Sequence, residues 1–125
     1  MSEDLEVTAT SVDGVRVVRA GGEFDADEAG RLAQALVAPF DGTALGVVVD
    51  LSRVTFADSS FLHTLIEAHR GHVAAGLPFV LAQPHPTVQR LLDLTDTARF
   101  FTVAPTTTAA VDGIRGSRSN GHHVR

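Results

Sequence analysis

Apolar and polar residues alternate near the start of the chain. Residues 5–9 and 15–20 both show the period of two that is typical of a strand with one buried face. Asp13-Gly14 between them is a dipeptide favoured in tight hairpin turns. We therefore expect the chain to open with a β-hairpin.

The spacing of apolar residues changes to that of a helix after the hairpin. Residues 21–22, both glycine, are expected to end the second strand, and Asp25 with Glu28 three residues later forms a capping-box pattern. Pro39 and the Asp-Gly pair that follows it are expected to end this first helix. Its predicted apolar face consists of Ala29, Leu32, Ala33, Leu36, Val37 and Phe40.

A continuous β-branched run at residues 46–51 predicts a strand buried on both faces, which places it at the centre of a sheet. Residues 52–57 are expected to form a loop, and a second helix is predicted to begin at residues 58–59. The predicted apolar side of that helix comprises Leu62, Leu65, Ile66, His69 and Val73.

The same alternation continues toward the C-terminus. Residues 77–82 read as another apolar strand, and Pro84 and Pro86 precede a third helix, since proline is tolerated in a first helical turn. Residues 99–103 predict a last short strand, and residues 105–111 predict a final helix cut by Gly113.

Strands that alternate with helices indicate an α/β fold with a mixed sheet, parallel except for the opening hairpin, and about four helices. A chain of 125 residues is long enough for one compact core and too short for two. We therefore predict a single domain over residues 1–113, followed by a disordered polar tail over residues 114–125.

Composition and charge exclude several classes of function. The chain has no cysteine, which rules out disulfides, thiol nucleophiles and cysteine-based zinc sites. It shows neither a signal peptide nor a membrane-spanning apolar stretch, so we expect a cytoplasmic protein without a membrane partner. Residues 1–113 hold seven arginines against fifteen carboxylates, and so acidic a domain is not expected to bind nucleic acid.

The most unusual local sequence delivers an acid and two serines to the start of the second helix. Asp58 is expected to cap that helix, which places Ser59 at the first helical position beside unpaired backbone amides. A phosphate on Ser59 would lie at the positive helix end, so the fold should tolerate it. A partner packed against this loop would instead face a desolvated dianion beside Asp58, which predicts a binding switch. A plain capping sequence is the alternative interpretation.

Three motifs, taken in order, resemble the STAS domain family. Residues 48–52 followed by residues 56–60 resemble its signature, in which a strand ending in Asp-Leu-Ser leads to an Asp-Ser-Ser-Gly helix start. Residues 22–25 resemble its Gly-Glu-Leu-Asp, and residues 88–94 its Val-x-Arg-Leu-Leu-x-Leu. The resemblance spans about residues 5 to 112, and the family's glycine after the two serines is Phe61 here. Helical geometry predicts that Phe61 lies at the edge of the exposed loop.

The resemblance implies an anti-sigma factor antagonist rather than an enzyme. In that subfamily the first serine of Asp-Ser-Ser is phosphorylated by an anti-sigma factor that is also a serine kinase with a histidine-kinase-like ATPase fold. A serine phosphatase resets the cycle. Ser59 is accordingly the predicted phosphorylation site, and no cofactor is expected. The predicted partner-binding residues are Glu23, Asp25, Asp58, Ser59, Ser60 and Phe61.

Other functions for these residues stay open. A STAS scaffold or transport-complex subunit would use the same surface without phosphorylation. Ser59 and His63 are four residues apart, as a nucleophile and its base could be, but the chain lacks a Gly-x-Ser-x-Gly elbow. His69 and His72 have the spacing of a metal pair without a further ligand, so we expect them to flank a helix C-terminus as cations.

Overall fold

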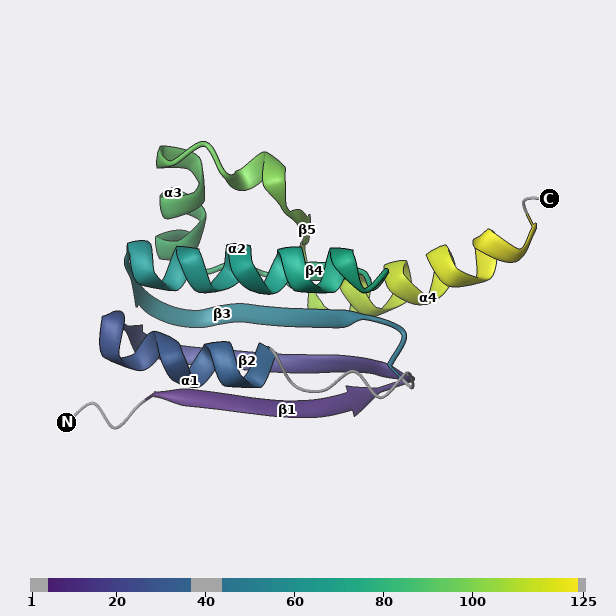
Figure 1. The fold of residues 1–125 in the computed structure, drawn as a ribbon, viewed down its shortest axis with the longest axis horizontal. Coiled ribbons are helices and arrows are strands. Elements are labelled where there is room, and N and C mark those ends of the chain that lie inside the picture. Colours follow the sequence, from purple (N-terminus) through teal and green to yellow (C-terminus); the bar gives the residue numbers. More distant parts are fainter. Residues whose placement is uncertain (1–4, 37–43, 124–125) are drawn as a thin grey trace.

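A computed structural model describes residues 5–36 and 44–123 of the protein, with side chains as far as residue 116. Five strands form one sheet in the order β1-β2-β3-β4-β5 (Figure 1). The strands β1 (Glu6–Val12) and β2 (Val15–Phe24) pair antiparallel. Asp13 and Gly14 join them with φ angles of 52° and 85°, the two positive values that a type I′ turn requires. The predicted hairpin is confirmed.

The remaining strands run parallel to β2. They are β3 (Val47–Ala57), β4 (Phe79–Ala82) and β5 (Thr102–Ala104). The strand β3 has a neighbouring strand on each edge and helices over both faces, so the run Val47–Val49 is at most 1% exposed. The prediction that this segment is the central strand is correct.

Four α-helices connect or cover the strands: α1 (Ala26–Leu36), α2 (Ser59–Ala74), α3 (Pro86–Leu94) and α4 (Thr107–His123). A short 3₁₀-helix, η1 (Ala98–Phe100), leads into β5. In Figure 1, α1 and α2 lie side by side over the sheet. The chain is thus an α/β domain with a mixed sheet, as predicted.

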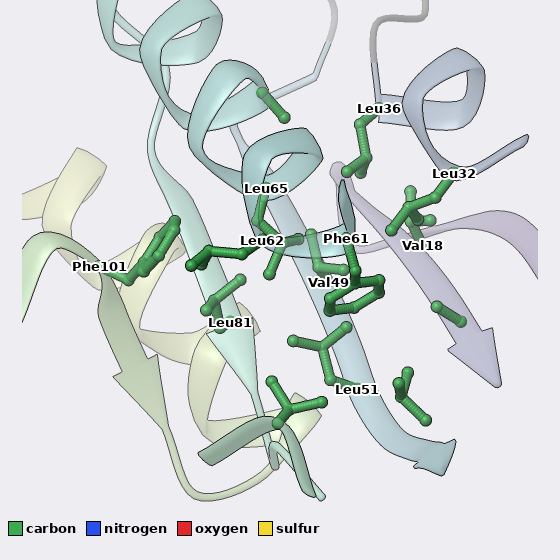
Figure 2. Close-up of a cluster of buried hydrophobic side chains, with 14 of the residues drawn as sticks. Val18, Leu32, Leu36, Val49, Leu51, Phe61, Leu62, Leu65, Leu81 and Phe101 are labelled. Atoms are coloured by element: carbon green, nitrogen blue, oxygen red, sulfur yellow. The ribbon is translucent and has the colours of Figure 1, made fainter. Parts of the chain in front are cut away.

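Two apolar cores lie on opposite faces of the sheet. The larger one joins β2, β3 and β4 to α1, α2 and α3, and Figure 2 shows its centre around Val49, Leu51 and Leu65. The smaller one packs alternate residues of the same strands against α4. The period-two pattern of each strand therefore serves both faces.

The strands β2 and β3 are longer than predicted. β2 continues through residues 21–22 to Phe24, and β3 includes residues 52–57, which were expected to be a loop. The register between the two strands shifts on either side of Gly22, whose φ is 99°. Bulges of this kind absorb glycines without ending a strand, so the predicted break at residues 21–22 is wrong.

The helices also differ from prediction at their ends. α4 begins at Thr107 and runs to His123 instead of stopping at Gly113. The predicted start of a polar tail at residue 114 is wrong, because Ile114 is 2% exposed in the smaller core. For the first helix, Val37, Phe40 and the predicted end at residues 39–42 lie outside the described residues.

Candidate functional site

Parallel pairing brings the two predicted site segments to the same edge of the sheet. In the register of β2 with β3, Glu23 lies opposite Phe56 and Phe24 lies opposite Ala57. Each strand is followed directly by an aspartate, Asp25 after β2 and Asp58 after β3, and the next residue starts a helix. Residues more than 30 positions apart in sequence therefore form one surface at the carboxyl ends of β2 and β3.

Both aspartates cap the helices that follow them. Asp58 Oδ1 accepts hydrogen bonds from the amides of Ser60 at 3.0 Å and Phe61 at 3.3 Å. Asp25 Oδ1 accepts from the amides of Asp27 at 3.0 Å and Glu28 at 3.1 Å. Each carboxylate thus satisfies two of the free amides at a helix N-terminus, so both predicted caps are confirmed.

Ser59 is the first residue of α2, and it is exposed. The first turn of α2 contains no acidic residue, so within this helix start only the cap Asp58 carries a negative charge. Ser60 is half-buried, and its carbonyl oxygen accepts a hydrogen bond from Thr64 Oγ1 at 3.1 Å. Of the two serines, Ser59 is therefore the more exposed to solvent.

Phe61 is not at the edge of an exposed loop, and that prediction is wrong. Its side chain is fully buried, and its ring lies 5.3 Å from the ring of Phe24, at 51° between the planes. Figure 2 shows Phe61 pointing from α2 toward Val49 and Leu51 on the sheet. Of the predicted apolar side of α2, Leu62 and Leu65 are buried and Ile66 packs against the core, whereas Val73 is 57% exposed. The buried side also includes Phe61, Ala68 and His72, which the prediction omitted.

Sequence reasoning missed Phe56, which is 46% exposed at the end of β3. It lies opposite Glu23 and two residues before Asp58. In the described part of the chain, Glu23, Asp25 and Asp58 make no ion pair. The surface around Ser59 therefore combines unneutralised carboxylates with one exposed aromatic ring. The alternation typical of a strand does not single out Phe56 as exposed, because the neighbouring residue Thr55 is exposed as well.

The structure gives little support to a hydrolase site at Ser59 and His63 or to a metal site. No hydrogen bond joins Ser59 to His63 in the described structure, and His63 is exposed. Across residues 5–36 and 44–123, no group of three or more His, Asp or Glu side chains has the arrangement of a metal site. The same residues include no helix that is long and apolar enough to cross a membrane.

His72 lies in the last turn of α2, as expected, and His69 is half-buried one turn before it, but both imidazoles pack against aromatic rings. His69 packs against the rings of Phe100 at 4.9 Å and Phe101 at 5.5 Å, and His72 is 1% exposed beside Phe79. Burial lowers the pKa of both imidazoles below 6.5, which favours their neutral forms. The expectation that they are cations is wrong. His85, in the loop before α3, caps that helix, with its Nδ1 accepting from the Thr87 amide at 3.1 Å.

Comparison with known protein families identifies one family that this chain matches. The model of the STAS domain matches residues 6–110, most of the chain. The chain belongs to the STAS domain family. The resemblance read from the motifs is thereby confirmed.

Solved STAS proteins share the fold over nearly their whole length. An anti-sigma factor antagonist from Mycobacterium paratuberculosis is 28% identical, with a TM-score of 0.78 over 92% of this chain and 97% of that one. A variant of RsbS from Moorella thermoacetica is 25% identical, with a TM-score of 0.76 over 91% and 98%. The phosphorylated form of SpoIIAA from Bacillus is 20% identical, with a TM-score of 0.67 over 88% and 98%.

Proposed function

We propose that this STAS domain is an anti-sigma factor antagonist that binds a kinase-type anti-sigma factor and is switched off by phosphorylation of Ser59. Its partner would be a serine kinase with a histidine-kinase-like ATPase fold. A serine phosphatase would restore the binding form. The protein itself acts as a substrate and binding module, not as an enzyme, in the cytoplasm where sigma factors work.

The observation that carries the proposal is the position of Ser59. It is exposed at the first position of α2, beside a cap whose two hydrogen bonds use the backbone amides of Ser60 and Phe61. A kinase can therefore reach its hydroxyl without unfolding the helix. The partial positive charge of the helix end offsets part of the phosphate charge, so the domain itself would stay folded.

The neighbouring carboxylates explain how the phosphate would act on binding. Glu23, Asp25 and Asp58 already make this surface acidic, and phosphorylation adds a charge of about −1.5 to −2. A partner that desolvates this surface would have to bury the new charge beside Asp58. Binding is thereby lost through local electrostatics, with little change in the fold. The anti-sigma factor antagonists among the solved relatives, one of them known in a phosphorylated form, support the proposal.

The test is intact-mass spectrometry with site mapping, before and after incubation with the candidate kinase and ATP. We expect one phosphate on Ser59, absent from Ser59→Ala and retained in Ser60→Ala. The Ser60→Ala variant is the matched control, because Ser60 lies one residue away and is half-buried. If Ser59 stays unmodified while the partner binds, the phosphorylation step is wrong. The chain would then be a constitutive or scaffold-type STAS module.

A further inference from the structure

Two buried aromatic rings join the two segments that carry the candidate site. Phe24 is the last residue of β2 and directly precedes Asp25, the cap of α1. Phe61 follows Ser59 and Ser60, and its amide is one of the two that Asp58 holds. Both side chains are fully buried, and their ring centroids are 5.3 Å apart. The rings therefore link the two helix starts from beneath the surface.

We propose that Phe61 is a positioning residue that holds the turn before α1 and the start of α2 together as one rigid surface. The inference rests on the proposed function in so far as that surface is the partner-binding site. Phe61 does not contact the partner in this view. It acts through Phe24, on the segment that presents Glu23 and Asp25.

This chain has a phenylalanine at position 61 where the family motif has a glycine, and that difference is the physical basis of the proposal. A glycine at position 61, as in the family motif, supplies no side chain, so Phe24 would lack its ring partner there. In this chain the ring of Phe61 provides aromatic contact at 5.3 Å and sits among residues that are also buried, including Val49 and Leu51. A close-packed contact of this kind transmits displacement instead of absorbing it. Movement of the turn at Asp58 should therefore displace the turn at Asp25 as well.

Backbone amide hydrogen exchange, followed by NMR on the full chain, tests this coupling. Phe61→Leu keeps an apolar side chain but removes the ring. We expect the amides of Asp27 and Glu28, which Asp25 caps, to exchange about tenfold faster in this variant relative to the core amide of Val49. The reciprocal variant Phe24→Leu should accelerate exchange of the Ser60 and Phe61 amides on α2 by a similar factor.

A matched control separates coupling from a general loss of stability. Ile114→Ala removes a buried side chain from the core on the opposite face of the sheet. It should accelerate the cap amides only as much as it accelerates the Val49 amide. The double variant Phe24→Leu/Phe61→Leu should accelerate the cap amides less than the product of the two single effects, because either change already breaks the contact.

The proposal is overturned if Phe61→Leu changes the amides of Asp27 and Glu28 only in proportion to Val49, as the control does. It is equally overturned if the two single effects simply multiply in the double variant. These measurements use unmodified protein without a partner. A failure of Ser59 phosphorylation would therefore leave their outcome unchanged, and the two proposals fail separately.

Discussion

Phe56 and Phe61 lie five residues apart, yet their surroundings differ completely. Phe56 is 46% exposed and Phe61 is fully buried. The same contrast holds for the histidines of α2, since His63 is exposed and His72 is 1% exposed. At the scale of the residue, burial sets what a side chain can do. The exposed ring of Phe56 is open to solvent, and burial lowers the pKa of His72, which favours the neutral imidazole.

The buried histidines predict a pH dependence of stability. Burial lowers the pKa of His69 and His72 in the folded state, whereas the unfolded chain takes up protons near 6.5. The unfolded state thus binds more protons as the pH falls below about 6.5, so the free energy of unfolding should decrease from there toward the lowered folded pKa. Arg16 and the neighbouring imidazole oppose protonation of His72, and the carbonyl of Ala68 favours it.

Denaturant titrations at pH 7.5 and 5.5 measure this effect. His69→Phe replaces a ring that packs among Phe79, Phe100 and Phe101 with one that does not titrate, so the variant should lose less stability between the two pH values. His63→Gln alters an exposed imidazole and should behave as the unchanged protein does. A decline in His69→Phe as large as in the unchanged protein would contradict the assignment.

At the scale of the element, α4 packs closely against the backbone of Gly46 just before β3. A Cβ at Gly46 would lie 3.1 Å from Ile114 Cγ2 and 3.1 Å from the carbonyl oxygen of Pro78. A side chain at residue 46 would therefore crowd α4, and Ile114 or the Pro78 backbone would have to shift by a few tenths of an ångström. Ile114, Val111 and Ala110 fill the space above the sheet, which makes this part of α4 structural.

We expect Ile114→Ala to lower the free energy of unfolding by about 2–4 kcal/mol, because it leaves a cavity between α4 and the sheet. Arg115→Ala should change it by less than about 0.5 kcal/mol, since the Arg115–Asp13 ion pair at 3.8 Å is exposed. Urea denaturation followed by circular dichroism gives both values. Equal effects of the two substitutions would show that α4 beyond Gly113 does not contribute to the core.

At the scale of the whole molecule, the candidate site lies at one end of the sheet. The carboxyl ends of β2 and β3 present Glu23, Phe56 and Ser59, whereas η1 presents Phe100 elsewhere on the molecule. Phe56 and Phe100 have similar exposure, 46% and 42%. Only Phe56 belongs to the surface that the proposed partner would cover.

These two phenylalanines give a test of where the partner docks. Phe56→Ala should weaken binding of the kinase that modifies Ser59 by about tenfold or more, since exposed aromatic residues near an interface centre are typical hot spots. Phe100→Ala should change the dissociation constant by less than about twofold. Isothermal titration calorimetry with the unphosphorylated protein measures both. A larger loss from Phe100→Ala would move the interface to the η1 side of the domain.

Much of the fold followed from local patterns in the sequence. The hairpin turn at Asp13-Gly14, the caps Asp25 and Asp58 and the apolar run of β3 each depend on residues within a few positions of one another. Their physical causes, turn geometry, satisfaction of helix amides and continuous burial, are therefore visible in a short window. The Asp-Ser-Ser segment and its helix position were predictable for the same reason.

Tertiary structure alone decided the rest, because the deciding contacts join distant residues. Phe61 is buried because α2 packs its ring against Phe24 at the end of β2, and no local period contains that contact. Gly22 could continue a strand because β3 supplied a partner for the bulge, and Ile114 extended the core because Gly46 left room for it. The sequence by itself determined the opening hairpin, the central strand and the serine that starts α2. Packing between those segments determined where the strands and helices end and which side chains are exposed or buried.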